Sequence, residues 1–477
     1  MNFFYKPQPG VVGDCIPYYF GGRYHVFFLC DKRDRDSYDI GSAWQHISTT
    51  DFVHFDDHGV ALEKGTMWEQ DHTVATGCVY TDDAGRHHIF YTGINPYMRN
   101  ETQREQALLH ATSDDLIRWT KHPEQVWEAD ESLYERHDWR DPFVYRHPQT
   151  GRYNMIIAAR TRNGPGNRRG CTGLLTSDDL ASWTVEKPLY APARYHGHEC
   201  PDWFQIGGWY YLVFSEYGTH TATRYVMSQS PDGPWIAPDE NQFDNRAFYA
   251  AKTASDGARR FLFGWNPSRT GDVDSGEWQW GGCLTVHEVV QRPDGTLAVR
   301  MPPEADAAFA GPNPVQLDLA DGWTEGGGAY RAEAPYRYSM ALSAERMPET
   351  YLLQGTLCFE TDAGSAGVLL RSDEAGNTAY SLRFNRSAQR LEFGKTGGYR
   401  PWYVDHMPEL DRPLAIRAGD RLHFKIIVDK TAVVVYVNDE VALSGRMYSN
   451  PFGRCGLYTD GATVSVTGLA ARTLPHR

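Results

Sequence analysis

A short run of apolar and aromatic residues, preceded by a glycine-bearing turn, recurs five times in the first three hundred residues of this chain. A glycine turn that introduces such a run is the signal of a β-hairpin. The recurrence at intervals of roughly fifty to sixty-five residues indicates internal repeats, each of them one supersecondary unit. The five runs are residues 24–29, 87–91, 153–157, 210–214 and 260–264, and the turns contain Gly21 with Gly22, Gly85, Gly151, Gly207 with Gly208, and Gly257.

A second element repeats in phase with the first. It is a polar turn followed by an aromatic residue on the next strand, at residues 48–55, 113–119, 177–183 and 228–235. One four-stranded blade per repeat produces this pattern. The sequence therefore predicts a five-bladed β-propeller over about residues 1–305.

The chain changes character after these repeats. Residues 301–313 are rich in Pro and Ala and break the pattern, and later runs such as 423–428 and 433–437 alternate apolar and polar residues between turns. Such alternation is typical of an antiparallel sandwich. With 477 residues the chain is too long for one core. We predict an all-β fold with a propeller at residues 1–305, a linker at 306–320 and a C-terminal β-sandwich at 321–477.

Charge and composition exclude several classes of partner. The formal net charge is −14 and Lys and Arg occur as scattered singles, so we expect no nucleic-acid partner. The N-terminus lacks the pattern of a secretory signal, and no stretch approaches the about 18 apolar residues of a membrane span, so we expect a cytoplasmic protein without a membrane partner. The eight cysteines show neither zinc-ligand spacing nor a disulfide framework.

Three acids stand at equivalent places in the repeats. Because the inner strand of every propeller blade faces the central funnel, reactive residues should lie near the start of each repeat. Asp14, Asp141 and Glu199 stand just ahead of the first, third and fourth hairpins. Each acid alone is as well explained as a solvated turn residue, and the shared phase is what favours a common site.

Paired carboxylates in a funnel are typical of glycoside hydrolysis. Retention of configuration needs one carboxylate to attack the anomeric carbon and one carboxylic acid, about 5 Å away, to protonate the leaving oxygen. The acid has to stay protonated near neutral pH, which a carboxylate-rich, partly apolar site arranges by raising its pKa. A third carboxylate can stabilise the oxocarbenium-like charge or bind sugar hydroxyls. The three acids together supply all of these functions.

Two motifs carry a family resemblance. Arg140-Asp141-Pro142 and Glu199-Cys200 closely resemble the Arg-Asp-Pro and Glu-Cys motifs of glycoside hydrolase family 32, the invertases, inulinases and levanases. Either motif alone is short, whereas both in order, one blade apart, are specific. Further similarity covers nearly the whole chain, at residues 22–28, 44–46, 76–77, 279–282 and 428–438.

The resemblance implies a retaining hydrolase of β-fructofuranosides, such as sucrose, fructooligosaccharides, fructans or difructose compounds, that works through a covalent fructosyl-enzyme. Asp14 is then the nucleophile and Glu199 the acid/base. Asp141 with Arg140 holds fructosyl hydroxyls, and Asp141 stabilises the transition state. The partner is a carbohydrate substrate, and no metal or organic cofactor is implied.

Five other residues complete the predicted substrate site. Aromatic faces pack against the C–H groups of sugar rings, and polar side chains bind hydroxyls. A place in a blade core competes with this interpretation for each tryptophan, and a structural role competes for the histidine. The residues are Trp44, Thr76, Trp139, His198 and Trp280.

The surroundings of the first acid depart from the family pattern. Family members usually carry Trp-x-Asn-Asp-Pro-Asn there, whereas this chain has Val-Val-Gly-Asp-Cys-Ile-Pro at residues 11–17. The Asp is kept and its Asn neighbours are not. These positions line the pocket for the first sugar, so the departure bears on which substrate is bound rather than on bond breaking.

Several alternatives stay open from the sequence. Fructosyl transfer passes through the same covalent intermediate as hydrolysis and differs in the acceptor. Arabinofuranosidases on a related five-bladed scaffold typically invert, with carboxylates farther apart. A carbohydrate-binding propeller with an inactive site is the third alternative, although binding alone does not require three mutually repelling acids. Linkage, exo or endo action, and the choice between monomer and homo-oligomer are also open.

Overall fold

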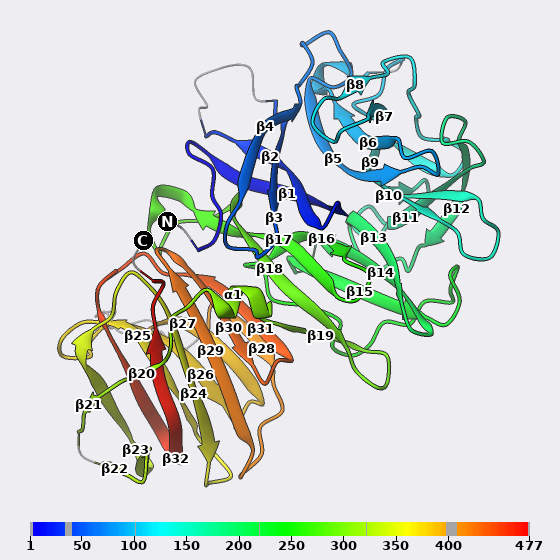
Figure 1. Cartoon of the computed structure of the whole chain (residues 1–477). Helices are drawn as coiled ribbons and strands as arrows, with labels where there is room; N and C mark the ends of the chain where they lie inside the picture. Colours follow the sequence, from blue (N-terminus) through cyan, green and yellow to red (C-terminus); the bar gives the residue numbers. More distant parts are fainter. Residues whose placement is uncertain are drawn as a thin grey trace.

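Five groups of antiparallel strands surround a common centre in the first three hundred residues (Figure 1). The structure, a computed structural model, describes residues 3–33, 41–100, 102–218, 220–320, 322–396 and 408–475. The innermost strands of the five groups contact one another in a ring, in the order β1, β5, β9, β13, β16 and back to β1. This arrangement is the five-bladed propeller that the repeats predict.

The blades follow chain order, each running from its inner strand outward. Blade 1 comprises β1 (Val11–Phe20), β2 (Arg23–Asp31), β3 (Trp44–Thr49) and β4 (Asp56–Leu62). Blade 2 comprises β5 (Thr73–Thr81), β6 (His87–Ile94), β7 (Gln106–Ser113) and β8 (Thr120–Lys121), with the short helix η1 (Pro96–Met98). Blade 3 comprises β9 (Tyr134–Arg146), β10 (Tyr153–Thr161), β11 (Gly170–Ser177) and β12 (Thr184–Tyr190). Blade 4 comprises β13 (Glu199–Ile206), β14 (Trp209–Glu216) and β15 (Ala222–Ser228). Blade 5 comprises β16 (Tyr249–Ser255), β17 (Arg260–Arg269), β18 (Trp278–Gln291) and β19 (Leu297–Arg300), with η2 (Thr270–Asp272).

The glycine turns form the hairpins expected of them. Phe20 pairs with Arg23, so Gly21 and Gly22 are a two-residue loop. Both glycines have positive φ, +59° and +80°, as a type I′ turn requires. A residue with a Cβ would be strained at either place. The glycine pair thereby fixes the register of the first hairpin.

The second repeated element is a hydroxyl-capped turn. Its Thr or Ser oxygen accepts the backbone N–H of a residue two positions later, and the residue after that one has a φ of +63° in the first three copies, whereas it is Pro231 in the fourth. Where a tryptophan follows, its indole N–H donates to the carbonyl of the positive-φ residue at 3.2 Å. The capping residues are Thr49, Ser113 and Ser177, the positive-φ residues are Phe52, Leu116 and Leu180, and the tryptophans are Trp119 and Trp183.

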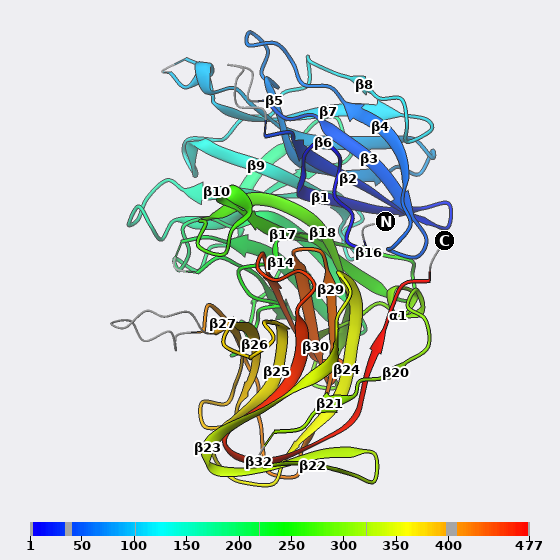
Figure 2. The same cartoon turned by 90° about the vertical axis from the view of Figure 1, so that its left-hand side faces the viewer.

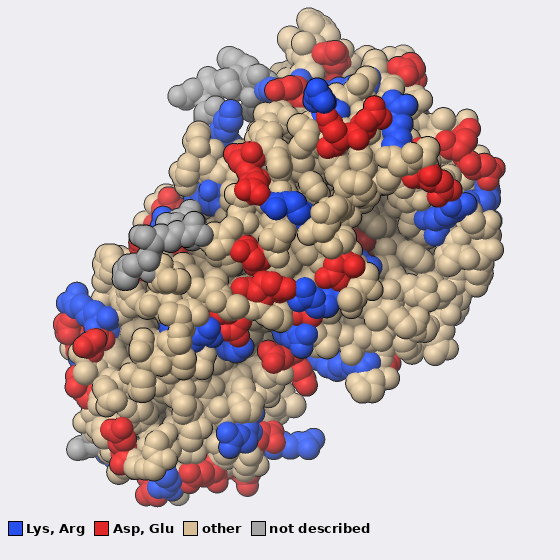
Figure 3. Space-filling model, viewed as in Figure 1, with Lys and Arg blue, Asp and Glu red and all other residues tan. Residues whose placement is uncertain are grey.

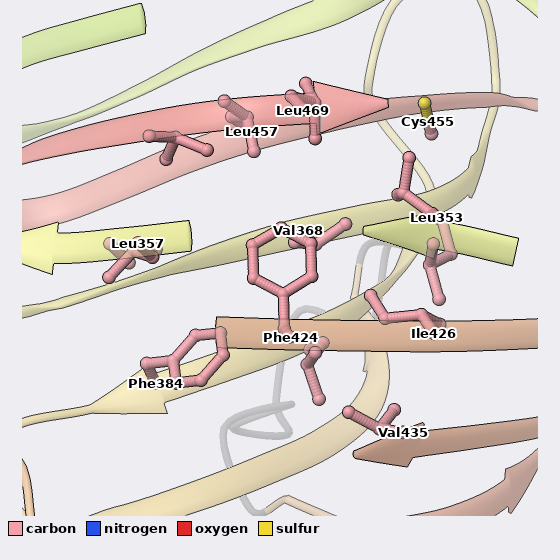
Figure 4. Packing of buried hydrophobic residues seen from close by; sticks show 14 of the residues in the cluster. Leu353, Leu357, Val368, Phe384, Phe424, Ile426, Val435, Cys455, Leu457 and Leu469 are labelled. Atoms are coloured by element: carbon pink, nitrogen blue, oxygen red, sulfur yellow. The ribbon is translucent and has the colours of Figure 1, made fainter. Parts of the chain in front are cut away.

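The remaining strands form a two-layered sandwich. The long strand β32 pairs with β23, β24 and β25, and so takes part in both layers. Apolar side chains of both layers interdigitate in one core, including Leu353, Val368, Phe424 and Leu457 (Figure 4). The strands are β22 (Trp323–Gly326), β23 (Ala329–Arg346), β24 (Thr350–Phe359), β25 (Ser365–Ser372), β26 (Ala379–Asn385), β27 (Arg390–Thr396), β28 (Leu410–Pro413), β29 (Arg421–Asp429), β30 (Ala432–Val437), β31 (Val441–Arg446) and β32 (Arg454–Arg472).

Propeller and sandwich share a buried junction. One hydrophobic cluster contains Phe248 of blade 5 together with Leu352 and Tyr436 of the sandwich. Helix α1 (Pro303–Ala307) lies at this junction, close to the two ends of the described chain (Figures 1 and 2). After it, β20 (Asn313–Pro314) pairs with β32 and β21 (Leu317–Asp318) with β23. The segment predicted as a linker therefore contributes two short strands to the sandwich sheet.

The surface mixes charges of both signs. On the face seen in Figure 3, acidic and basic side chains are interspersed, and the propeller half is hollowed. Within the described ranges, no helix has the length and apolar character needed to cross a membrane.

Candidate active site

A β-bulge interrupts the inner strand of every blade at the residues facing the funnel. Between strands β1 and β2, residues 13 and 14 oppose one residue, and β9, β13 and β16 have the same irregularity at residues 141–142, 200–201 and 250–251. In β5 the extra residue is Thr76. Bulges re-aim side chains and are common next to active sites. Here they lie at or beside each of the three predicted acids, and they explain why the acids occur at similar offsets of 10, 12 and 11 residues before the runs that begin at 24, 153 and 210.

Asp14 is held by donors from two other blades. Its Oδ2 accepts a hydrogen bond from Thr76 Oγ1 at 2.6 Å, and its Oδ1 accepts one from the Trp265 indole N–H at 3.0 Å. Burial and the neighbouring charge of Asp141 nevertheless raise the pKa of Asp14 to about 6. The carboxylate is therefore oriented by neutral donors but destabilised by a like charge.

Asp141 is 3 % exposed, with a φ of +58°. Its backbone N–H donates to Thr92 Oγ1 at 2.7 Å, and its Oδ2 accepts the backbone N–H of Cys200 at 2.9 Å. Arg140 Nε lies 3.8 Å from the same oxygen. Burial raises the pKa of Asp141 against the opposing charge of Arg140. A positive φ in a non-glycine residue is costly, so its place at the bulge marks this position as functionally constrained.

Glu199 opens strand β13 and is held on both oxygens. Arg140 Nη2 donates to Oε1 at 3.0 Å, and Tyr249 Oη donates to Oε2 at 2.6 Å. Burial and the charge of Glu199 raise the pKa of Tyr249 well above its ordinary value, so the phenol stays a donor. Arg140 in turn contacts Asp138, which keeps the guanidinium in one position.

Cys200 contacts both Asp14 and Asp141. Its Sγ lies 3.7 Å from Asp14 Oδ2, while its backbone N–H binds Asp141. Burial, followed by the charge of Asp14, raises the pKa of this thiol. Cys200 therefore stays protonated and acts as a weak donor to the site rather than as a nucleophile.

Trp280 forms an accessible wall beside Asp14. Its side chain is 40 % exposed, and its ring centroid is 6.0 Å from that of Trp265. A Cβ built on Gly13 would overlap the Trp280 indole. Gly13 is not among the glycines with positive φ. Glycine is therefore needed here for lack of space, because the Trp280 ring occupies the position of a Cβ atom. The family pattern has Asn at the position of Gly13. In this chain the Trp280 ring occupies the space that the Asn side chain would need.

Three predicted substrate contacts lie in blade cores instead, and as direct contacts these predictions are wrong. Trp44 is fully buried and donates to the Ala75 carbonyl at 3.0 Å, and Trp139 is fully buried and donates to the Trp127 carbonyl at 3.2 Å. His198 is also fully buried, packs on Phe214 and has its pKa lowered by burial to about 3. None of the three has a face left for a sugar.

Two residues that sequence reasoning missed complete the geometry. Trp265 and Tyr249 come from blade 5, and their rings lie 5.4 Å apart. Tyr249 stands ahead of the fifth hairpin at the offset that the acids occupy in other blades, so the repeat phase was a usable signal. Trp265 follows the run 260–264 directly and had no comparable signal.

The chain matches family models and known relatives over most of its length. The model of the glycosyl hydrolases family 32 N-terminal domain matches residues 7–300, and that of the family 32 C-terminal domain matches residues 339–473. Raffinose invertase of Escherichia coli is 26 % identical over 452 residues, which cover 90 % of this chain and 85 % of that protein. Sucrose-6-phosphate hydrolase of Escherichia coli is 25 % identical over 458 residues, covering 91 % of this chain and 86 % of that protein. The solved structure of sucrose-6-phosphate hydrolase from Lactobacillus gasseri is similar with a TM-score of 0.75 at 18 % identity, covering 100 % of this chain and 93 % of that one.

Proposed function

Because the chain belongs to glycosyl hydrolase family 32, we propose that it hydrolyses neutral β-fructofuranosides with retention of configuration, using Asp14, Asp141 and Glu199. The observation that carries the proposal is the convergence of these acids from three blades. Cys200 contacts both aspartates, and Glu199 precedes it in the chain. Three neighbouring carboxylates repel one another, which destabilises the folded protein. A positive charge that develops in the transition state offsets this repulsion.

The reaction proceeds in two displacements. In the first, the Asp14 carboxylate attacks the anomeric carbon of the fructosyl unit while Glu199 gives its proton to the leaving oxygen, so a covalent fructosyl-Asp14 ester forms. In the second, Glu199 takes a proton from water, which attacks the same carbon and releases Asp14. Asp141, with Arg140 beside it, binds sugar hydroxyls and stabilises the oxocarbenium-like charge.

The surroundings of each acid suit its role. Thr76 and Trp265 hold one oxygen of Asp14 each, which orients the nucleophile. Arg140 and Tyr249 do the same for Glu199, which fixes the orientation of its carboxyl group. Such fixed donors need no reorganisation during the reaction. Trp280, with its exposed ring beside Gly13, is the aromatic platform for the sugar.

The arginines of segment 160–170 are engaged in ion pairs and hydrogen bonds within the protein, which favours a neutral substrate. A phosphate group on the leaving sugar would call for cationic side chains that are available to it. Arg160 binds Glu135 at 3.1 Å, and Arg169 binds the same carboxylate at 2.5 Å. Arg162 and Arg168 donate to the backbone carbonyls of Glu131 and Arg194. The basic segment 160–170 is thus engaged within the protein.

The test is product analysis on a matched set of substrates. Purified protein is incubated with sucrose, raffinose, sucrose 6-phosphate, inulin and levan oligosaccharides and an arabinofuranoside, with Asp14→Asn as the blank. We expect fructose from the neutral fructosides, and initial release of β-fructose by NMR. A preference for sucrose 6-phosphate would contradict the neutral substrate, and an inverted product would contradict the mechanism. Activity confined to the arabinofuranoside would overturn the proposal as a whole.

A further inference from the structure

Three histidines on neighbouring strands of blade 1 face one another outside the funnel. His25 lies on β2, His46 on β3 and His58 on β4, and one ring nitrogen of each lies within 4.8 Å of the other two. His25 Nδ1 and His46 Nε2 are 2.9 Å apart, and the rings of His46 and His58 have centroids 4.4 Å apart. The residues are 21 and 12 positions apart in sequence, so only strand pairing unites them, and sequence analysis predicts no metal site.

Blade 2 repeats the same arrangement. His88, His110 and His122 follow their blade 1 counterparts by 63, 64 and 64 residues. His88 Nδ1 and His110 Nε2 are again 2.9 Å apart, and the middle histidine of each blade stacks on a phenylalanine, Phe27 or Phe90. The two triads thus occupy one position of the repeat and can be compared directly.

The two triads differ in what binds their remaining nitrogens. In blade 2, His88 Nε2 binds Asp82 at 3.2 Å, His110 Nδ1 binds Gln125 Oε1 at 2.5 Å, and His122 Nε2 binds Thr112 Oγ1 at 2.9 Å. In blade 1, His46 Nδ1 is buried without a hydrogen-bond partner among the described residues. The outer histidines are held alike, because Ser48 binds His58 Nε2 as Thr112 binds His122 Nε2. Among the described residues, the triads differ at Nδ1 of the middle histidine, which has a partner only in blade 2, and in the three ring nitrogens that converge within 4.8 Å only in blade 1.

The chemistry of the blade 1 triad is that of a ligand set. Three imidazoles from neighbouring strands bring ring nitrogens within 4.8 Å of one another, and imidazole is a preferred ligand of late first-row divalent cations. Ser48 Oγ holds His58 Nε2 at 2.8 Å, and the backbone of Phe20 hydrogen-bonds His25; such outer partners orient ligating imidazoles. β4 is the outermost strand of the blade, so a cation can arrive from solvent.

The spacing of the His25–His46 pair needs a small adjustment. Tetrahedral Zn²⁺ with bonds of about 2.0–2.1 Å keeps its ligating nitrogens about 3.3 Å apart. His25 Nδ1 and His46 Nε2 would have to separate by about 0.4 Å from their 2.9 Å hydrogen bond. The metal then lies between these atoms, and the proton shared by them moves to the other nitrogen of the ring that carried it, so both imidazoles stay neutral.

We propose that His25, His46 and His58 bind a late first-row divalent cation, with Zn²⁺ as the best fit, and that the cation ties together β2, β3 and β4. Three imidazoles with one position left for water suit Zn²⁺, Ni²⁺ or Cu²⁺ and not Mg²⁺ or Ca²⁺. The site lies on the outer strands of the blade, so its role is structural and its test does not depend on glycosidase activity.

The experiment titrates chelator-treated protein with Zn²⁺ by calorimetry and with Co²⁺ by absorption spectroscopy. We expect one site per chain, with the visible bands of four-coordinate Co²⁺. His58→Gln, a change on the edge strand, should weaken Zn²⁺ binding on the order of tenfold or more, whereas the matched variant His122→Gln in blade 2 should bind as the wild type does.

Thermal unfolding supplies the second readout and a check on folding. Zn²⁺ should raise the melting temperature of the wild type and of His122→Gln and leave that of His58→Gln unchanged. If His58→Gln unfolds early without metal, His25→Gln replaces it. The proposal fails if the wild type binds neither ion, if a folded blade 1 variant keeps wild-type affinity, or if His122→Gln loses binding equally.

Discussion

Two buried aspartates, Asp14 in the funnel and Asp244 at the junction with the sandwich, have pKa values that are shifted in opposite directions. Asp14 accepts hydrogen bonds from Thr76 and Trp265, yet its pKa is raised to about 6. Asp244 accepts the Ser444 N–H at 2.9 Å and the Ser444 hydroxyl at 2.6 Å, and His287 Nε2 lies 3.2 Å away. Burial alone would raise its pKa as well, but His287 and Ser444 hold it below the ordinary value.

The difference lies in the hydrogen bonds as well as in the neighbouring charges, because the hydrogen bond from His287 has the largest lowering effect on the pKa of Asp244. Both aspartates have good donors, but the funnel adds Asp141 and Glu199, whereas the junction adds a histidine. At the junction, the carboxylate of Asp244 joins two domains. In the funnel the acids repel one another, and a positively charged transition state relieves this repulsion. Removing each carboxylate should therefore have opposite effects on stability.

Asp14→Asn should have the largest effect on activity. We expect kcat/KM to fall on the order of 10⁴-fold or more, because the nucleophile is gone. Stability should rise at pH 7, because the charged form of Asp14 is disfavoured in the folded state. Since the folded pKa is about 6 against 3.8 ordinarily, this penalty is complete above pH 6 and vanishes below 3.8. Urea unfolding at pH 7 and at pH 3.5 checks the sign, and a less stable variant at pH 7 would break the comparison.

Asp244→Asn should act in the reverse sense. We expect a loss of about 1–3 kcal/mol at pH 7, because charge-assisted bonds across the junction are weakened. The folded pKa is lowered, so the stabilisation is present above about pH 3.8 and is lost as the pH falls through the folded value. The gap between variant and wild type in urea unfolding should narrow accordingly at low pH. Asp83→Asn, which removes an exposed pair with Arg146, is the control and should change little.

Much of this architecture is predictable from the chain because it is periodic. The hairpins and capped turns recur at one interval, so the propeller follows from them, and the phase of the three acids follows from the same interval. The bulges that turn Asp14, Asp141 and Cys200 toward the funnel leave no separate mark in the sequence. Periodicity thus identifies which residues share a level of the propeller.

Direction of a side chain within a blade is harder to predict. Trp44, on β3, packs between blades 1 and 2 and away from the funnel. His198, just ahead of β13, packs on Phe214. A one-residue change of register reverses the face of every side chain on a strand, and composition does not reveal it. For the same reason the facing histidines of blade 1 could not be predicted before their strand pairing was known.

Thr76→Val sharpens the comparison by removing one donor from the funnel. The Thr76 hydroxyl lowers the pKa of Asp14 against burial and repulsion, so its loss should raise that pKa further. The ascending limb of kcat/KM against pH, which reports ionisation of the nucleophile in the free enzyme, should lie near pH 6 in the wild type and move to higher pH in the variant. Thr150→Val, on an exposed turn, should leave the limb in place. A shift to lower pH would mean that another group controls this limb.

Gly13→Ala should have the smallest effect and tests the neighbour of the nucleophile. The new methyl group would overlap the Trp280 indole, so the ring must move from beside Asp14. We expect kcat/KM to fall on the order of tenfold in the wild-type background, because small displacements near reacting groups are costly. In the Trp280→Ala background the methyl group has room, and the added loss should be close to none. Steady-state kinetics of the four proteins form a double-mutant cycle. Equal losses in both backgrounds would mean that glycine is required by the backbone at the bulge, and that Trp280 does not decide the shape of the pocket beside Asp14.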